Sequence, residues 1–240
     1  MQLSGKVALV TGGTDGIGAQ LIRQLRDKGA TVITSGRDPA RIAATQAAGF
    51  DVIAADLSSA QGVDALLGGL GDRAIDLLVN NAGMGADYDF RDGRPDMAET
   101  ERGLFLNLHA PIHLITRLMP VLRARPEATI VNVTSGLAIA PRAGGPIYCA
   151  TKAGLRSYTQ AIRAQLAGTK ITVIEALPPV VETRMTAGRS NKKMSPQDCA
   201  AQIVAGIERG TTEVNVGIVK LLQVVNSISP GLARRIMLKF

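Results

Sequence analysis

The chain has no tryptophan, and aromatic residues make up only 3% of its 240 positions. Proteins that bind single-stranded nucleic acid usually stack the bases on aromatic side chains, so this class of function is disfavoured. Acidic residues are also in deficit, with 20 Asp and Glu against 27 Lys and Arg. A basic chain favours anionic partners, but its basic residues form no long run. We expect no nucleic-acid partner; a membrane surface or a phosphorylated small molecule stays open.

Cysteines and long hydrophobic runs are equally scarce. The two cysteines, Cys149 and Cys199, have neither disulfide nor metal-site spacing. The N-terminal residues show no basic stretch followed by an apolar core, so we expect no secretion signal. No charge-free apolar run reaches the roughly 18 residues that a membrane-spanning helix needs. These absences predict a cytoplasmic protein with no membrane span.

What the chain does contain is an alternation of short β-branched runs with longer helical segments. The runs predicted to be strands are 6–11, 31–35, 50–56, 75–80, 128–134, 171–177 and a weaker 213–217. The segments predicted to be helices are 16–28, 38–48, 59–70, 95–124, 146–168 and 196–209. Continuously apolar strands are typical of a sheet buried on both faces. The pattern predicts one α/β domain over 1–240, with a doubly wound parallel sheet of about seven strands and helices on both faces.

Three irregular segments, 84–95, 136–146 and 184–196, follow the fourth, fifth and sixth predicted strands. Ligands of such sheets bind outside the carboxyl ends of the strands, so these loops are expected to frame a substrate cleft. The apolar residues expected to line this cleft are Ile139, Pro141, Met185 and Met194.

The stretch "TGGTDGIG", residues 11–18, joins the first predicted strand to the first helix. Glycines let the backbone approach a diphosphate, and the helix N-terminus supplies N–H donors and partial positive charge. The glycine spacing is looser than the usual dinucleotide fingerprint. The alternative is a glycine-rich turn that binds no ligand.

The ends of the second and third strands carry charged residues. Arg37 stands where an arginine accommodates the 2′-phosphate of NADP, whereas a carboxylate would favour NAD. Asp38, followed by Pro39, is expected to cap the next helix. Asp56 either accepts a hydrogen bond from an adenine amino group or caps the helix that follows it.

Tyr148 and Lys152 in "GPIYCATKAG" are four positions apart, which places both on one face of a helix. Alone, this spacing fits either an acid/base couple or a solvated stripe of the helix surface.

Taken together, "TGGTDGIG", "NNAG" at 80–83, "VTS" at 133–135 and "YCATK" at 148–152 resemble the short-chain dehydrogenase/reductase family, classical type. The resemblance covers essentially the whole chain. Within the family, "PEATIVNVTSGLAIAP", "YCATKAGLRSYT" and "PPVVETRM" are most similar to the DltE-like subgroup, whose name refers to D-alanine esterification of teichoic acids and implies no defined substrate.

The resemblance implies a Rossmann-type fold and a catalytic tetrad of Asn107, Ser135, Tyr148 and Lys152. Tyr148 would be the acid/base, and the Lys152 ammonium would lower the pKa of the phenol from its usual value of about 10. Ser135 would bind the substrate oxygen. Asn107 would hold a water that relays protons towards Lys152, or else serve only as a buried hydrogen-bonding bracket.

The resemblance also implies a nicotinamide cofactor, NADP(H) by preference because of Arg37, with NAD(H) possible. The residues expected to bind it are Gly12, Thr14, Asp15, Gly16, Ile17, Gly18, Arg37, Asp56, Leu57, Asn80, Ala82, Gly83, Tyr148, Lys152, Pro178, Val181 and Thr183. Two positions depart from the family pattern. Pro179 replaces a common glycine, and Asp15 stands where some NADP-preferring members have a basic residue; Asp15 is expected to face the helix terminus.

The remaining reactive side chains are assigned no chemistry. His109 and His113 are spaced like metal ligands but lack a third ligand, so no metal site is expected. Cys149 is expected to be a packing residue because its side chain points about 100° away from Tyr148 around the helix.

Two further features concern partners. Segment 219–240 is apolar with four basic residues, and it forms either an amphipathic helix on an anionic membrane or a helix packed on its own domain or on a second subunit. The resemblance places Arg156 and Arg163 at a subunit interface and implies a homodimer or homotetramer. The predicted function is an NADP(H)-dependent oxidoreductase acting on a carbonyl or secondary alcohol of a small molecule; the alternative is a non-catalytic NADP-binding sensor or scaffold.

Overall fold

The computed structural model describes residues 1–85, 87–188 and 192–239. Parts of three predicted segments lie outside the described residues: Ala86 in the loop 84–95, residues 189–191 in the loop 184–196, and Phe240 at the C-terminus.

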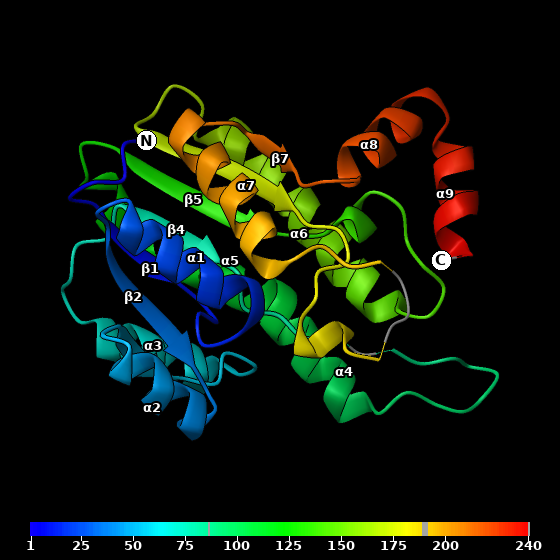
Figure 1. The fold of residues 1–240 in the computed structure, drawn as a ribbon, viewed down its shortest axis with the longest axis horizontal. Coiled ribbons are helices and arrows are strands. Elements are labelled where there is room, and N and C mark those ends of the chain that lie inside the picture. The colour runs from blue at the N-terminus through cyan, green and yellow to red at the C-terminus, as the bar shows by residue number, and fades with distance from the viewer. Residues whose placement is uncertain (86, 189–191, 240) are drawn as a thin grey trace.

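Seven parallel strands form one sheet in the order β3-β2-β1-β4-β5-β6-β7, which confirms the predicted fold class (Figure 1). The strands are β1 Val7–Val10, β2 Thr31–Gly36, β3 Asp51–Ala54, β4 Leu77–Asn80, β5 Ala128–Val133, β6 Ile171–Leu177 and β7 Glu213–Asn215. All seven predicted runs became strands because their β-branched residues pack on both faces of the sheet.

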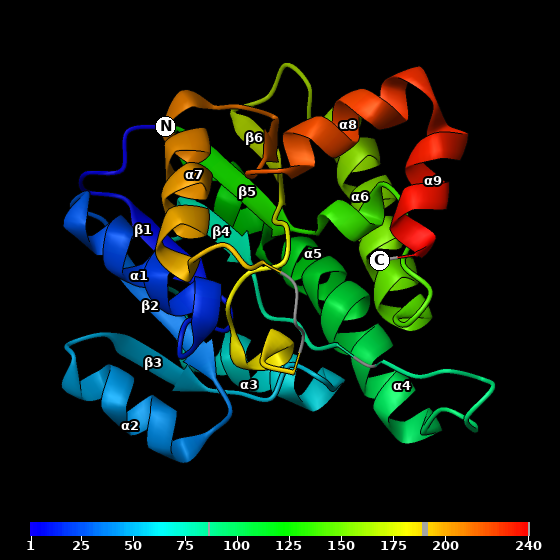
Figure 2. The same cartoon turned by 45° about the vertical axis from the view of Figure 1, so that its right-hand side comes forward.

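Helices cover both faces of this sheet (Figures 1 and 2). The helices are α1 Gly16–Asp27, α2 Pro39–Ala47, α3 Ala60–Leu70, α4 Met97–Leu104, α5 Ala110–Arg123, α6 Pro146–Gln165, α7 Pro196–Arg209, α8 Val219–Ile228 and α9 Pro230–Leu238. One core cluster joins the sheet to α1 and α7, with Leu21 and Ile203 fully buried. The second joins the opposite face to α3, α5 and α6, with Leu66 and Leu114 among its buried residues.

The predicted helix over 95–124 is wrong as a single element. It is divided into α4, a π-helical turn at Phe105–His109, and α5. The amide of Ala110 bonds to the carbonyl of Phe105, five residues earlier. A π-helical turn inserts an extra residue into the helical repeat and often marks a functional site. Here it contains Asn107.

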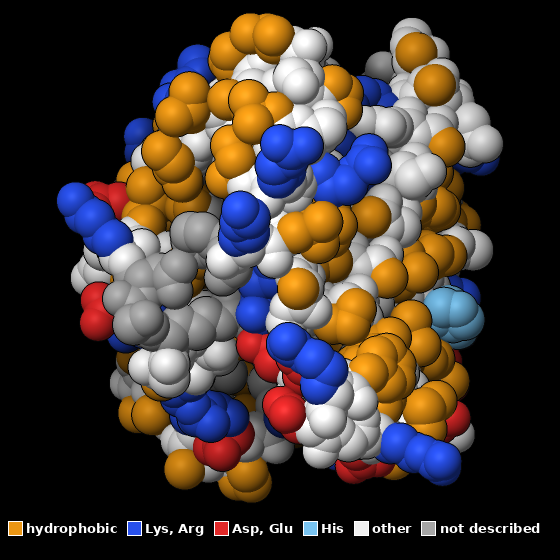
Figure 3. Space-filling model, turned by 90° about the vertical axis from the view of Figure 1, so that its right-hand side faces the viewer, with side chains coloured by type: hydrophobic (Ala, Val, Ile, Leu, Met, Phe, Trp, Pro, Cys, Tyr) orange, Lys and Arg blue, Asp and Glu red, His pale blue; other side chains and the backbone are white. Residues whose placement is uncertain are grey.

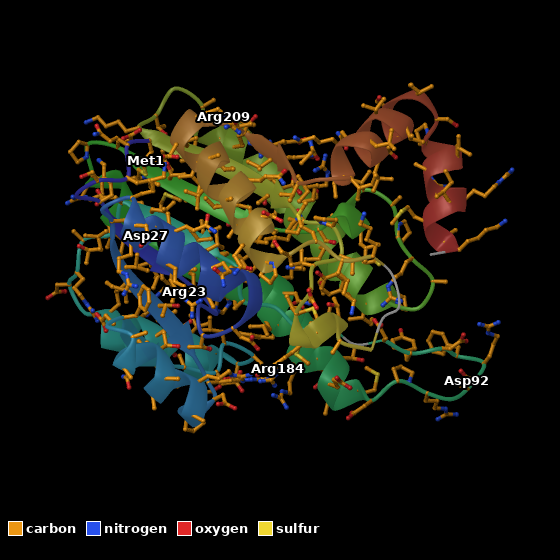
Figure 4. The ribbon with its side chains drawn as sticks, viewed as in Figure 1. Met1, Arg23, Asp27, Asp92, Arg184 and Arg209 are labelled. Atoms are coloured by element: carbon orange, nitrogen blue, oxygen red, sulfur yellow. The ribbon has the colours of Figure 1, made fainter. Side chains whose placement is uncertain are left out.

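The chain reverses its direction across the sheet between β1 and β4, which are neighbours although two strands separate them in the sequence. Such a switch point leaves a crevice beyond the carboxyl ends of the strands. The loops predicted to frame a cleft, after β4, β5 and β6, leave the sheet at this edge. Figure 4 shows the first of them projecting outward around Asp92.

The C-terminal segment forms two helices rather than the one that the sequence suggested. Ser229 lies between α8 and α9 in an extended conformation, and Pro230 begins the second helix. The two helices pack against each other at one end of the sheet (Figures 1 and 2). None of the helices in the described ranges has the length and hydropathy that a membrane span requires.

Candidate active site

A cavity of about 980 Å³ opens at the switch point and continues to the ends of β5 and β6. All of the predicted cofactor-binding residues except Asn80 line it. Ser135, Tyr148 and Lys152 from the predicted tetrad line the same cavity. The structure therefore joins the glycine-rich turn and the proposed acid/base couple in one space.

Glycine is required in the first turn for two reasons. Gly12 and Gly16 have φ angles of 69° and 52°, a region that other residues rarely adopt. At Gly18, a Cβ atom would lie 2.1 Å from the carbonyl oxygen of Gly12, so a side chain there would break the turn. The turn thus keeps the start of α1 at the cavity wall, where the partial positive charge of the helix N-terminus acts on the space.

Asp15 caps α1, as expected from its place before the helix. Its side chain accepts a hydrogen bond of 2.8 Å from the amide of Gly16. It also pairs with Arg41 at 3.3 Å and lies 3.7 Å from Arg184, a residue labelled in Figure 4. These two guanidinium groups offset the negative charge that Asp15 brings to the cavity edge.

Arg37 at the end of β2 and Asp56 beyond β3 form an ion pair of 3.3 Å at the rim of the cavity. Burial opposes ionisation of Asp56, but hydrogen bonds from Ser58 and the charge of Arg37 outweigh it, so its pKa is below the ordinary value. Ser59, and not Asp56, caps α3. Asp38 caps α2 with Pro39 in the first turn, as expected.

Arg41 is a cavity residue that sequence reasoning missed. It lies on α2, one helical turn after Asp38, and its side chain pairs with both Asp38 and Asp15. The only signal in the sequence was its position a few residues after Arg37. Together with Arg37 it gives this end of the cavity two guanidinium groups.

Lys152 is 3% exposed, and its ammonium donates a 2.8 Å hydrogen bond to the carbonyl oxygen of Val133 at the end of β5. Burial lowers the pKa of Lys152 to about 8. Its Nζ atom lies 5.7 Å from the centroid of the Tyr148 ring, on the same face of α6. The spacing of four residues therefore places the two side chains beside each other inside the molecule.

Ser135 lies two residues after the end of β5 and is almost fully buried. Its hydroxyl accepts a hydrogen bond from the amide of Leu137, which caps the short helical turn Gly136–Ala138. This bond fixes the Ser135 oxygen at the cavity wall and leaves the hydroxyl proton available to a ligand.

Asn107 binds the backbone of the loop after β4. Its Nδ2 donates to the carbonyl of Met84 at 2.8 Å, and its Oδ1 accepts from the amide of Met84 at 2.9 Å. The same Nδ2 lies 3.2 Å from the hydroxyl of Thr151, next to Lys152. Asn107 does not line the cavity. Asn107 thus forms the buried hydrogen-bonding bracket, one of the two roles that the sequence left open for it. The other role, holding a water that relays protons towards Lys152, stays a prediction.

Asn80, the other predicted residue outside the cavity lining, is 3% exposed and donates to the side chain of Asn132 at 2.8 Å. Asn132 in turn donates to Thr159 on α6. These bonds tie β4, β5 and α6 together beneath the site. The neighbouring Asn81 lines the cavity and holds the first turn through the carbonyls of Thr11 and Gly12.

Among the described residues, Met185 is the one member of the predicted apolar lining that reaches the cavity. The prediction is wrong for Ile139, Pro141 and Met194. Met194 instead packs against the core beside Gly217. A further apolar wall comes from α8 and α9, whose residues were not assigned to the cleft from the sequence.

A family model described as short chain dehydrogenase matches residues 6–194 of the chain. The chain belongs to the short-chain dehydrogenase family. This confirms the resemblance seen in the sequence motifs.

Individual members of the short-chain dehydrogenase family agree with this assignment. The chain is 35% identical over 224 residues to the uncharacterized oxidoreductase DltE of Bacillus subtilis (strain 168), with 89% of each chain covered. A short-chain dehydrogenase from Sphingobium yanoikuyae, solved in complex with NADPH, has 26% identity and a TM-score of 0.82, covering 95% of this chain and 94% of its own. A short-chain dehydrogenase from Burkholderia cenocepacia, solved with NADP, shares the fold at 24% identity, a TM-score of 0.88 and 99% coverage of both chains.

In this short-chain dehydrogenase, β6 carries a fully buried carboxylate that the sequence did not reveal. Glu175 accepts a 2.7 Å hydrogen bond from Thr134 and pairs with Arg156 at 2.6 Å. Burial raises the pKa of Glu175, although Thr134 and Arg156 act in the opposite direction. Because Thr134 lies between Val133 and Ser135, this network supports the strand end that holds Lys152 and Ser135.

Arg156 and Arg163 have contacts within the chain, while their predicted place at a subunit interface stays a prediction. Arg156 bridges Glu175 and Glu213. Arg163 donates to the backbone carbonyls of Val173 and Thr212. Both side chains are used to attach α6 to the last two strands.

The other reactive side chains are Cys149, His109 and His113. Cys149 on α6 is buried, and its thiol lies 3.8 Å from the carbonyl oxygen of Arg142 in the loop before this helix. The ring of Phe105 contacts His109 in a tilted geometry and His113 edge-on, along the π-helical turn and α5. Among the residues that the structure describes, no group of three or more His, Cys, Asp or Glu is arranged to hold a metal ion.

Proposed function

We propose that the protein is an NADP(H)-dependent oxidoreductase that transfers a hydride between the nicotinamide ring and a carbonyl or secondary alcohol. The observation that carries this proposal is the single cavity shared by the glycine-rich turn, Arg37, Ser135, Tyr148 and Lys152. A dinucleotide cradle and an acid/base couple are the two parts that such a reaction needs.

The residues present fit a nicotinamide dinucleotide. At Gly12 a Cβ atom would meet the backbone of Ala82 at 3.0 Å, so the turn after β1 lies close against the loop after β4 and has no room for side chains. The start of α1 would hold the diphosphate, and Asp56 and Leu57 the adenine end. Val181 and Thr183, beyond β6, would hold the nicotinamide end. When bound, the cofactor supplies the hydride and accepts it in the reverse direction.

The chain's own residues manage the proton. In the reductive direction the Tyr148 hydroxyl donates a proton to the substrate oxygen as the carbonyl carbon is reduced, which yields the alcohol. The buried charge of Lys152 stabilises the phenolate that remains. Ser135 donates a hydrogen bond to the substrate oxygen and orients it. The bond from Lys152 to the carbonyl of Val133 holds the ammonium in place for this role.

The preference for NADP(H) rests on Arg37 and Arg41. Both guanidinium groups line the cavity at the end of β2, where the ribose of the adenosine half would lie. A 2′-phosphate would take the place of the carboxylates with which they now pair. The relative from Sphingobium yanoikuyae, solved with NADPH, supports a nicotinamide cofactor.

The proposal also includes a cytoplasmic location and the assembly of the protein into a homodimer or homotetramer.

The test is NADPH oxidation, followed by its absorbance, across a panel of ketones and aldehydes, with the corresponding alcohols and NADP⁺ as the reverse panel. The proposal expects turnover of at least one carbonyl substrate. NADPH binding without turnover of any substrate would instead favour the sensor or scaffold.

A further inference from the structure

The C-terminal helices α8 and α9 form a wall of the same cavity. Every residue that 218–239 contributes to the lining is apolar. These residues are Ile218, Val219, Leu221, Leu222, Val225, Ala233, Ile236 and Met237. The four basic residues of the segment are exposed and stand outside the lining: Lys220, Arg234, Arg235 and Lys239.

This wall begins next to the proposed reacting centre. Gly136 follows Ser135 directly, and a Cβ atom built on it would lie 3.0 Å from Val219 Cγ2 and 3.6 Å from Leu222 Cδ2. The first turn of α8 therefore packs against the backbone beside Ser135. From there the lining continues along α8 to Val225 and across to α9.

Several residues of the wall remain in contact with water although they line the cavity. The exposed fractions are 66% for Ile218, 58% for Leu221 and 51% for Ile236. Figure 3 shows hydrophobic side chains over much of the face of the molecule on which α8 and α9 lie, interspersed with Lys and Arg. Contiguous exposed apolar surface inside a cavity is typical of a binding site for an apolar ligand.

We propose that the substrate carries an extended hydrocarbon portion, which lies along α8 and α9 while its carbonyl group lies at Ser135 and Tyr148. This inference rests on the proposed oxidoreductase function and names the class of its substrate. The wall recognises hydrocarbon rather than charge, because the basic residues of the segment face away from the cavity lining. Small polar carbonyl compounds would leave the wall in water and gain nothing from it.

The experiment compares kcat/KM with NADPH along the 2-alkanones from 2-butanone to 2-decanone. Three proteins are used: the wild type, Val225→Asn and Val224→Asn. Val225 lines the cavity, whereas its neighbour Val224 is 53% exposed and stands outside the lining, so the second variant is a matched control.

For the wild type, kcat/KM is expected to rise with chain length, by up to about fourfold for each methylene that becomes fully buried and by tenfold or more over the series. Val225→Asn is expected to flatten this rise, and a urea-unfolding midpoint close to that of Val224→Asn shows that the variant is folded. Val224→Asn is expected to keep the wild-type dependence.

Each other outcome is decisive. If kcat/KM of the wild type does not depend on chain length, the hydrocarbon substrate is wrong while the oxidoreductase stands. If all three proteins show the same rise, the hydrocarbon does not lie on α8. If no alkanone is reduced but another carbonyl compound is, the hydrocarbon substrate is wrong. If no carbonyl compound of any kind is reduced, the proposed function itself fails.

Discussion

The ammonium of Lys152 is bound to the backbone carbonyl of Val133 at 2.8 Å, two residues before Ser135. This bond attaches the helix that carries Tyr148 to the strand end that carries the serine. It fixes the three side chains relative to one another without requiring a ligand. It also holds the ammonium of a lysine that is only 3% exposed.

The stability of the protein should depend on pH through Lys152. Burial lowers its pKa from 10.5 to about 8, so between these values the unfolded chain holds a proton that the folded chain has released, and stability rises with pH. The measured quantity is the free energy of unfolding of the wild type minus that of Lys152→Met. This difference should increase by about 2 kcal/mol between pH 7.5 and 9.5. Urea unfolding at both pH values measures this, and a constant difference between the two proteins would contradict it.

The choice of cofactor should depend on Arg37. Arg37→Ala removes a charged hydrogen-bond donor, so the affinity for NADPH should fall by roughly ten- to a hundredfold while the affinity for NADH changes little. Arg102→Ala is the control, because Arg102 lies 3.7 Å from the same Asp56 but does not line the cavity. Equal losses for the two cofactors, measured by titration calorimetry, would mean that Arg37 does not bind the phosphate.

Asn107 should stabilise the loop after β4. Asn107→Ala leaves both backbone groups of Met84 without their partner, which should cost about 1–3 kcal/mol in the free energy of unfolding. Asn107→Asp keeps the acceptor for the Met84 amide but loses the donor to its carbonyl, and should fall between the alanine variant and the wild type. An alanine variant as stable as the wild type would show that the bracket has no structural role.

Glu175 should be more important for stability than Glu213, although Arg156 pairs with both. Glu175 is fully buried, so Glu175→Gln leaves the guanidinium without its buried counter-charge and should cost about 3 kcal/mol. Glu213→Gln removes a partly exposed partner at 3.4 Å and should cost about 1 kcal/mol or less. If the two variants lose similar amounts of unfolding free energy, the buried ion pair of Arg156 with Glu175 is not the more stabilising of the two.

The sequence predicts the sheet well because its strands are apolar on both faces, and no other local structure explains seven such runs. The cavity-lining residues near glycines and strand ends were predicted for a similar reason. Their position in the chain determines their position at one edge of the sheet. Thr183, for example, follows β6 and lies 3.0 Å from the place of a Cβ atom on Gly16.

Features that depend on contacts between distant segments were not predictable. The apolar pattern continues through 95–124, so nothing in it marks the π-helical turn at Asn107. Glu175 is one polar residue within the apolar run "ITVIEAL", and its partner Arg156 comes from another element. The wall formed by α8 and α9 depends on how the chain folds back after β7, which local periodicity does not encode.

The most direct test of the central claim is the reaction of Tyr148→Phe. If the Tyr148 hydroxyl is the proton donor, this variant binds NADPH with the affinity of the wild type, because only one oxygen has been removed from the cavity wall. Its reduction of a carbonyl substrate should fall by about 10²–10⁴-fold. NADPH binding is followed by fluorescence and turnover by absorbance on the same sample. Turnover close to that of the wild type would contradict the account.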